Sequence, residues 1–229
     1  GFHSWTCQTN GTTNNDYVFG VHSSSGSIGA VFFSLIPNKW QHLTLVKSTS
    51  AIEVYINGIL IQSAACIGTI NYSNPHLYLS AWGGGGRHWN GQIDEVRIWN
   101  TALNQTQIRD GMCRKLTPTD ALYSNLSAYY NFDESNGNSV FDFTINSNHG
   151  TLQNSPSRTS SGAPIGNYSS HDYLNTTKTV SLVHTAGDSF TVVNSTGSPD
   201  GLHVYMVDEL PNTQSGISVI GLNNKYFGV

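Results

Sequence analysis

Asp94 is the residue whose setting most strongly suggests chemistry. It opens the run DEVRIW at 94–99, whose pattern predicts a β-strand. Side chains of a strand alternate between its two faces, so Asp94 shares a face with Val96 and Ile98. A carboxylate beside apolar neighbours is unfavourable unless it is paired, hydrogen-bonded or bound to a metal. Two interpretations stay open: a calcium ligand, since hard cations prefer oxygen, or a carboxylate held by backbone N–H groups or an arginine.

A second group of oxygen-bearing side chains lies between residues 133 and 150. Its carboxylates and amides are interspersed with glycines, and such a loop can wrap a calcium ion, although the order of residues differs from an EF-hand. The alternative is a polar hairpin loop, in which Asp and Asn side chains cap their own backbone. The candidate metal ligands in this loop are Asp133, Asp142, Asn146 and Asn148.

A third candidate is the loop WGGGGRHW at 82–89. An exposed indole can stack on the apolar face of a sugar ring, and Arg or His side chains can hydrogen-bond its hydroxyl groups. The candidate ligand-binding residues are therefore Trp82, Arg87, His88 and Trp89. The alternative is that one or both tryptophans close the edge of the core, which is the commoner position of Trp.

The residues that could carry out catalysis are not arranged for it. Retaining glycosidases need two carboxylates facing one another, whereas Asp94 and Glu95 are adjacent and point to opposite faces of a strand. Asp133 and Glu134 have the same defect if they are extended. The sequence contains no Gly-x-Ser-x-Gly elbow, phosphate loop or His-Glu-x-x-His motif. We therefore expect a protein that is not an enzyme.

Composition limits the class of protein. The chain has 229 residues, of which 38% are hydrophobic and only 10% charged, with a formal net charge of −4. This is enough apolar material for a sizeable core, and the thin negative charge argues against nucleic acid as a partner. No apolar run is long enough to span a membrane. Turn-forming polar residues fill the place of charges, which favours a β-rich secreted protein.

Three cysteines, Cys7, Cys66 and Cys113, lie far apart and do not have the spacing of a zinc site. Free thiols and a single disulfide with one thiol left over both fit this number in an oxidising compartment. The sequence does not choose a pair.

The elements that would position the candidate residues are mostly strands. Alternating runs separated by turn residues fill residues 1–99, as in a β-sandwich. The pair Asn57-Gly58 predicts a type I′ hairpin, and a two-residue loop would place Val54 opposite Ile61. The expected strands are 4–7, 17–22, 30–35, 40–46, 52–56, 59–63, 76–81 and 92–99.

The pattern changes after residue 99. Asn104 is the expected N-cap of a short helix, with Gln107 completing a capping box. A strand is expected at 126–132, and a linker rich in Ser, Gly and Pro follows from about 155 to 170. From 178 onward a hairpin and two more strands predict a second, smaller β-sheet unit.

Several motifs taken in order resemble a known family. They are WQHLTLV at 40–46, VYING at 54–58 and GQIDEVRIWNTAL at 91–103, followed by the capped helix. They are similar to the laminin-G-like, concanavalin A-like jelly-roll domains of large secreted or surface bacterial proteins. The run AYYNFDE at 128–134 resembles the segment that often follows such domains, and SGAPIG at 161–166 resembles its exit.

The resemblance covers about residues 1–166 and implies an all-β, antiparallel jelly-roll β-sandwich with one short helix. It implies a calcium ion at Asp94, with backbone carbonyls completing the coordination. It also implies one or two further strands ahead of Trp5, which this chain lacks and which can supply calcium ligands. Residues 167–229 are similar to β-units that follow such domains. The chain therefore reads as a piece of a longer protein with two domains, 1–166 and 167–229.

Two functions agree with this interpretation. The first is a non-catalytic, lectin-like module of an adhesin, stabilised by calcium, with a carbohydrate or another cell-surface molecule as its ligand. The alternative is a structural repeat unit of a surface filament or stalk, in which copies would associate with one another. Both functions place the chain outside the cell or at the cell surface.

Overall fold

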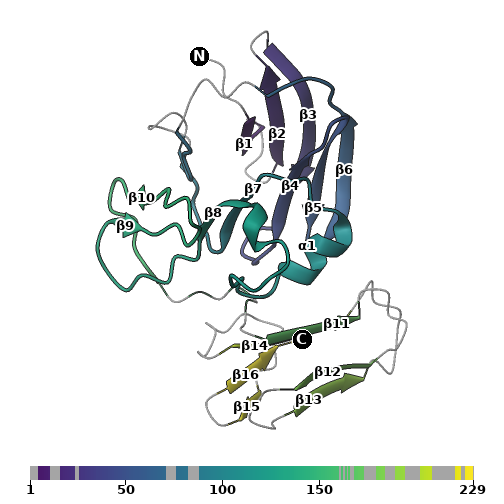
Figure 1. The fold of residues 1–229 in the computed structure, drawn as a ribbon, viewed down its shortest axis with the longest axis vertical. Coiled ribbons are helices and arrows are strands. Elements are labelled where there is room, and N and C mark those ends of the chain that lie inside the picture. The colour runs from purple at the N-terminus through teal and green to yellow at the C-terminus, as the bar shows by residue number, and fades with distance from the viewer. Residues whose placement is uncertain are drawn as a thin grey trace. The chain divides into compact units, whose positions relative to one another are not determined.

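The computed structural model of this chain consists of antiparallel sheets and one short helix (Figure 1). All strand pairs in the described part are antiparallel, and α1 (Gln105–Gly111) is its one α-helix, which confirms the expected all-β fold. No helix of this part is both long and apolar enough to cross a membrane. The structure describes residues 5–10, 16–23, 26–70, 76–81, 88–159, 161, 163 and 165, and the backbone of six later strands.

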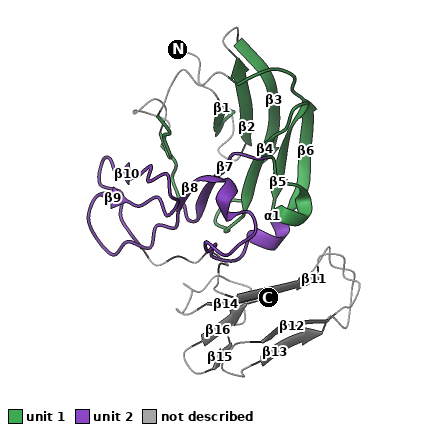
Figure 2. Ribbon diagram, in the orientation of Figure 1, with its two compact units in different colours: residues 1–92, 102–108 green, residues 93–101, 109–229 purple. Residues whose placement is uncertain are grey.

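The chain forms two compact units that are interleaved in sequence (Figure 2). Unit 1 contains residues 1–92 and 102–108, and unit 2 contains residues 93–101 and 109–229. The predicted domain boundary between residues 166 and 167 lies outside the described residues and stays a prediction.

Unit 1 is built from two three-stranded sheets, ordered β1-β2-β3 and β4-β5-β6. The strands are β1 (Trp5–Thr9), β2 (Asp16–Ser23), β3 (Gly26–Ser34), β4 (Leu43–Lys47), β5 (Ala51–Ile56) and β6 (Ile59–Ala65). Apolar side chains from both sheets form one buried core. Its members are Phe19, Val21, Val31, Phe33, Ile52, Val54 and Cys66. Two antiparallel sheets that share a core form a β-sandwich.

The hairpin between β5 and β6 has the predicted turn but not the predicted strand register. Asn57 and Gly58 have φ values of 50° and 72°, as a type I′ turn requires. A β-bulge between Val54 and Tyr55 then shifts the register, so that Val54 faces Gln62. The predicted pairing of Val54 with Ile61 is therefore wrong, because a bulge adds one residue to one strand.

Four of the expected strands are shorter or absent, and one of them, expected at 126–132, ends at Tyr130. Residues 76–81 contain no strand, and β4 begins only at Leu43. The strand expected from residue 92 begins at Val96, because Glu95 adopts a left-handed φ of 52° that interrupts extended backbone. Asp94 therefore lies just outside the strand whose alternation was used to place it.

Unit 2 begins with the pair β7 (Val96–Trp99) and β8 (Leu126–Tyr130), the latter preceded by the 3-10 turn η1 (Tyr123–Asn125). The two faces of this pair pack into separate clusters, as alternation predicted. Val96 and Ile98 pack with Ala128, Tyr130 and Val140, whereas Trp99 packs with Leu116, Leu126 and Tyr129. A second pair joins β9 (Ser139–Val140) to β10 (Gly150–Thr151).

The capping box at the start of α1 is confirmed. The Gln107 backbone N–H donates to Asn104 Oδ1 at 3.0 Å, and the Asn104 N–H donates to Gln107 Oε1 at 2.9 Å. Ile108 is buried on the inner face of this helix.

The late strands of unit 2 form a four-stranded sheet, ordered β11-β14-β16-β15, and the pair β12-β13. The pair confirms the hairpin expected beyond residue 178. The bounds are β11 (Tyr168–Asp172), β12 (Thr179–Val183), β13 (Ser189–Val193), β14 (Leu202–Val207), β15 (Ile220–Leu222) and β16 (Lys225–Gly228).

Candidate functional site

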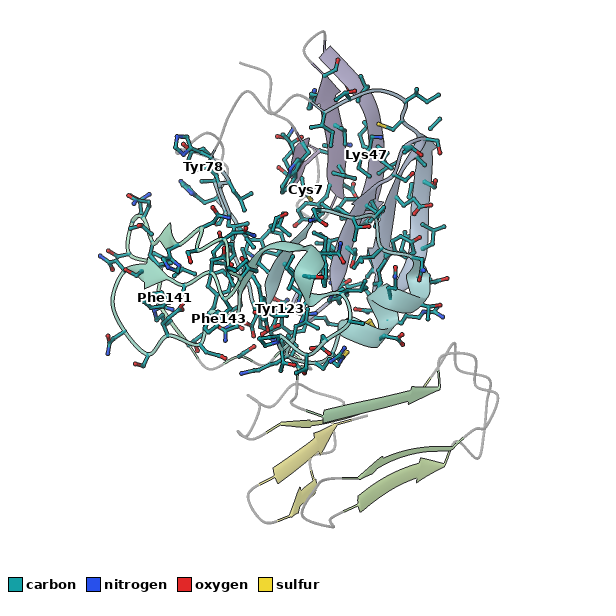
Figure 3. The ribbon with its side chains drawn as sticks, in the orientation of Figure 1. Cys7, Lys47, Tyr78, Tyr123, Phe141 and Phe143 are labelled. Carbon is teal, nitrogen blue, oxygen red and sulfur yellow. The ribbon has the colours of Figure 1, made fainter. Side chains whose placement is uncertain are left out.

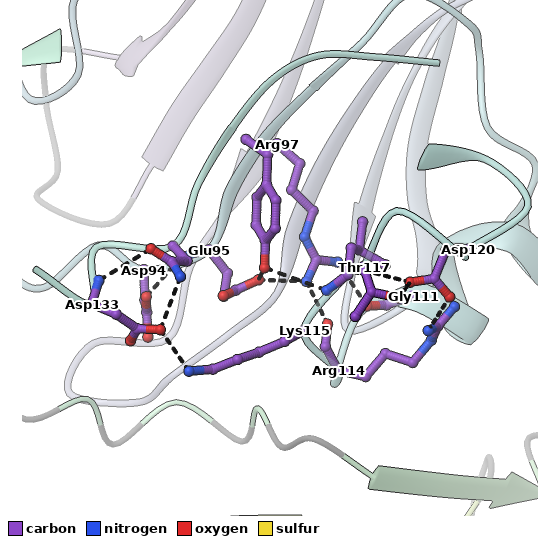
Figure 4. Close-up of polar contacts among 12 residues, drawn as sticks. Asp94, Glu95, Arg97, Gly111, Arg114, Lys115, Thr117, Asp120 and Asp133 are labelled. Atoms are coloured by element: carbon purple, nitrogen blue, oxygen red, sulfur yellow. Dashed lines mark hydrogen bonds and ion pairs between the residues drawn. The ribbon is translucent and has the colours of Figure 1, made fainter. Parts of the chain in front are cut away.

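A buried ion pair lies next to Asp94 in unit 2 (Figure 4). Arg97 Nη2 donates to Glu95 Oε2 at 2.6 Å, and only 7% and 5% of their side chains are exposed. The Tyr129 hydroxyl donates to the same Glu95 oxygen at 2.7 Å, and Arg97 Nη1 donates to the Gly111 carbonyl at 2.7 Å. Burial raises the pKa of Glu95, although the Arg97 charge and the Tyr129 hydroxyl act against it. Glu95 is therefore engaged inside the fold.

Asp94 is half-buried and held by two hydrogen-bond donors. Its Oδ1 accepts the backbone N–H of Glu95 at 2.8 Å, and the Ser161 hydroxyl also bonds to its carboxylate. Burial raises the pKa of Asp94, these two bonds lower it, and the negative charge of Asp133 raises it again. The structure thus brings the carboxylates of Asp94 and Asp133 near one another.

Lys115 neutralises this pair of carboxylates. Its Nζ donates to Asp133 Oδ2 at 2.6 Å, and the Asn131 amide donates to the same oxygen at 2.9 Å. Asp133 and Asp94 in turn contribute to raising the pKa of Lys115, against a desolvation that lowers it. The sequence reasoning missed Lys115, because eighteen residues separate it from Asp133 and no local pattern joins them.

The side chains around Asp94 offer oxygen donors of the kind that bind calcium. Asp94 and Asp133 supply carboxylate oxygens and Ser161 a hydroxyl, the donor types that calcium prefers. Glu95 Oε1 is also buried without a hydrogen-bond partner. No group of three or more His, Cys, Asp or Glu side chains suited to a metal occurs among the described residues, so backbone carbonyls would have to complete the coordination.

Asp142 occupies a different place, and its oxygens are fully used. Oδ1 accepts the backbone N–H groups of Tyr129 and Thr144, and Oδ2 accepts the Asn148 N–H and the Thr144 hydroxyl, all within 3.0 Å. Burial raises the pKa of Asp142, but these four bonds together hold it below its ordinary value. Three N–H groups and one hydroxyl occupy the positions where a cation would approach, so Asp142 does not fit a metal.

The side chains of Asn146 and Asn148 bind the backbone of β8. Both amide groups donate to the Ser127 carbonyl at 3.1 Å. Asp142, Asn146 and Asn148 therefore lie together and hydrogen-bond their loop to β8. Asp133 does not take part in these bonds and contacts Lys115 instead.

The predicted ligand-binding loop is described only in part. Trp82 and Arg87 lie outside the described residues. The Trp89 backbone N–H donates to Ser80 Oγ at 2.9 Å, and His88 Nδ1 lies 3.2 Å from the Ser80 carbonyl. The Trp89 ring is exposed and packs 5.7 Å from the ring of Tyr17 on β2, at an interplanar angle of 44°. Sequence reasoning missed Tyr17, since nothing local connects it with residue 89.

The three cysteines are free in the structure. Burial raises the pKa of the Cys113 thiol to about 12, so it stays protonated and unreactive.

Comparison with known proteins agrees with this geometry. Residues 3–109 match the family model for laminin G-type domains of the concanavalin A-like lectin/glucanases superfamily. No curated protein sequence matches the chain. Among solved structures, a candidate carbohydrate binding protein from Bacteroides ovatus is 21% identical with a TM-score of 0.53, over 73% of this chain and 52% of that one.

A second solved structure is an S-layer domain-containing protein from Clostridium thermocellum (residues 221–444). It is 16% identical with a TM-score of 0.31, over 47% of this chain and 62% of that one. The present chain spans about half the length of the Bacteroides protein, and at 21% identity that likeness shows the fold alone. The two packed sheets of unit 1 agree with the match to this family model over residues 3–109, and the fold of that part of the chain is laminin-G-like and concanavalin A-like.

Proposed function

We propose that this chain is a non-catalytic carbohydrate-binding module of an adhesin-like protein, acting outside the cell or at its surface. The observation that carries the proposal is the exposed indole of Trp89, held beside the ring of Tyr17 on the laminin-G-like domain. Its superfamily is named for lectins as well as glucanases, and the Bacteroides neighbour is described as a candidate carbohydrate binding protein.

The Trp89 ring is positioned before any ligand arrives. The bonds to Ser80 close the base of its loop, and Gly91 leaves room for the indole, because a Cβ on Gly91 would lie 2.6 Å from Trp89 Nε1. An aromatic ring fixed in this way loses little conformational freedom when a sugar stacks on it. A neutral glycan also suits a chain with so few charges.

Binding without catalysis is supported by the state of the carboxylates. A glycosidase needs two carboxyl groups that both reach the substrate. Glu95 is engaged with Arg97, and Glu134 is engaged with Arg158 at 2.9 Å. Asp142 is saturated by four hydrogen bonds.

Calcium forms a separate part of the proposal. We place it at Asp94 and Asp133, where the oxygen donors fit, in competition with the Lys115 ammonium that contacts Asp133. The ion would neutralise two carboxylates that now share a single lysine. It would bind the folded chain only and would thereby stabilise it.

Glycan-array binding tests the proposal, with the wild-type chain, Trp89→Ala and the matched control Trp5→Ala compared in calcium and in chelator. Trp5 is also exposed but lies on β1. We expect Trp89→Ala to lose the glycans that the wild type and Trp5→Ala retain. Well-folded wild type that binds no glycan in either condition would contradict the proposed function.

A second candidate function, a structural repeat that self-associates, is favoured by strand β6. It lies at the end of the strand order of its sheet and exposes Ile59, Leu60 and Ile61. An exposed apolar edge strand is a template for pairing with another chain. Sedimentation of the wild type and Ile61→Lys separates the two functions, since only self-assembly would be reduced by the added charge.

A further inference from the structure

Three large apolar side chains point into solvent from one short segment of unit 2. Phe141, Phe143 and Ile145 are 48%, 50% and 98% exposed, whereas the intervening Asp142 and Thr144 are only 4% and 7% exposed. The exposed fractions thus alternate from residue 141 to residue 145, and the Phe143 ring also packs on the Tyr129 ring with centroids 6.1 Å apart. We call the three exposed side chains the apolar row, and Figure 3 labels its two phenylalanines in unit 2.

The backbone under the apolar row is fixed at successive residues. The Phe141 N–H donates to Glu134 Oε1 at 2.7 Å, and the Phe143 N–H donates to the Tyr129 carbonyl at 2.9 Å. The Tyr123 hydroxyl donates to the Phe143 carbonyl at 2.7 Å. The four hydrogen bonds to the buried Asp142 carboxylate also hold this segment in place. The backbone of this surface is therefore already ordered, so binding a ligand would cost little conformational entropy of the backbone.

The imidazole ring of His149 lies beside Phe141, at one end of the row. The His149 ring lies edge-on to Phe141, with centroids 5.3 Å apart at an angle of 79°. Its Nδ1 accepts the backbone N–H of Asp142 at 3.0 Å, so the neutral ring carries its proton on Nε2. His149 is exposed, and its Nε2–H is thus a donor beside an aromatic face.

The surroundings of the row favour a neutral ligand. The Asp142 carboxylate is buried under it, and the Glu134 carboxylate is paired with Arg158. Asn146, Ser147 and Asn148, which follow the row in the sequence, are uncharged and exposed. Aromatic faces with uncharged hydrogen-bonding neighbours suit a molecule that has both an apolar face and hydroxyl groups.

The size of the row favours a small ligand over a protein surface. A phenylalanine half exposed offers about 100 Å². Together with Ile145, the row presents less than half of the ~800 Å² that one partner buries in a standard protein interface. We therefore propose that the apolar row and His149 form a carbohydrate-contacting surface, separate from the Trp89 loop, on which a neutral sugar ring stacks. This inference rests on the proposed function and adds a second contact surface to it.

Affinity electrophoresis of the full chain through gels containing xylan, mannan, laminarin or hydroxyethylcellulose tests the proposal. The variants are Phe141→Ser/Phe143→Ser, Ile145→Asn and Trp89→Ala. Phe32→Ala is the matched control, since Phe32 is an exposed phenylalanine of β3. Thermal melting shows which variants fold. Ile145→Asn keeps the test valid if the double variant does not fold, because Ile145 is almost fully exposed.

We expect at least one polysaccharide to retard the wild type and Phe32→Ala. Retardation should weaken roughly tenfold in the double variant and less in Ile145→Asn, as expected for losing one stacked face. Retardation that is lost in Trp89→Ala and unchanged in both row variants would overturn this inference and leave the proposed function intact. No retardation of any folded protein would overturn both. Self-association abolished by Ile145→Asn, without any effect on retardation, would instead assign the row to a protein contact.

Discussion

Arg97 and Glu95 form an ion pair of 2.6 Å in which both side chains are more than nine-tenths buried. Replacing Arg97 with Met leaves the Glu95 carboxylate buried without its cation. We expect the free energy of unfolding to fall by about 3–5 kcal/mol, because an unpaired buried charge is strongly unfavourable. Urea denaturation measures this loss. The control is Arg114→Met, which breaks a more exposed pair with Asp120 and should lower stability by less than about 1 kcal/mol. Equal losses in the two variants would show that Glu95 finds another partner.

Asp142 makes stability depend on pH in the acid range. Its hydrogen bonds hold its folded-state pKa below the ordinary value, so its contribution is complete above the unfolded pKa of about 3.9. That contribution is lost as the pH falls through the folded pKa. We expect Asp142→Asn to be less stable than the wild type at pH 7 and to lose less stability between pH 5 and pH 2. Denaturation at a series of pH values measures both effects. Thr144→Val removes only one of the four bonds, so its stability at pH 7 and its loss of stability in acid should be intermediate between those of the wild type and Asp142→Asn.

Lys115 should limit how strongly calcium stabilises the fold. Lys115→Met removes the ammonium group that contacts Asp133, so the two carboxylates become free to attract a cation. We expect calcium to raise the melting temperature of this variant more than that of the wild type. The gain in its free energy of unfolding should reach about 2.7 kcal/mol when free calcium is one hundred times the dissociation constant. Asp94→Ala should abolish the response, and Asp94→Asn should weaken it less. Melting curves of the wild type and Lys115→Met that are both indifferent to chelator would remove calcium from the proposal.

Gly91→Ala should move the Trp89 indole without unfolding the domain. The added Cβ would lie 2.6 Å from Trp89 Nε1, so the side chain of Trp89 would have to leave its present position. We expect weaker glycan binding and a shifted tryptophan emission, with little change in melting temperature. Gly111→Ala is the control, because its Cβ would meet only Arg97 Nη1 at an ordinary 3.8 Å. Unchanged emission in Gly91→Ala would mean that the indole already occupies several positions.

Gly29 and Cys66 meet in the core of unit 1. A Cβ on Gly29 would lie 2.8 Å from Cys66 Sγ, so Gly29→Ala overpacks the sandwich and should lower stability by about 1–3 kcal/mol. Cys66→Ala alone leaves a small cavity at the same point. The double variant removes the contact with Sγ but keeps one of 2.9 Å with the Cβ of residue 66, so it should lose less than the sum of the two single losses without returning to wild-type stability. Thermal or urea unfolding of all four proteins checks this, and strict additivity would contradict the contact.

Local signals in the sequence predicted local structure well. The Asn57-Gly58 turn and the Asn104–Gln107 capping box depend on residues close together in the chain, and both are present. The bulge at Val54 and the left-handed backbone at Glu95 depend on how strands pack, and no pattern in their own sequence announces them.

The candidate site was harder to predict for the same reason. The sequence identified Asp94 as a carboxylate in need of a partner, and the structure supplies Ser161 and the Glu95 N–H. Neither the hydroxyl of residue 161 nor the charge of Asp133 could be assigned to Asp94 from spacing. The loop at 141–149 alternates apolar and polar residues at its start, but its many turn-forming residues gave no sign that Asp142 would be buried.

The interleaving of the two units determines how this module can be cut or transplanted. The chain passes between units at 92/93, 101/102 and 108/109, and the match to the family model ends at residue 109, next to the last of these crossings. A fragment trimmed to that match would contain β7 without its partner β8 and Asp94 without Asp133. Gene fusions that borrow this domain should therefore extend past Leu152, which packs in the same cluster as β7 and β8, to Ser161, whose hydroxyl bonds to Asp94. For the same reason, recombination between homologous genes can exchange the module intact only at breakpoints beyond that residue.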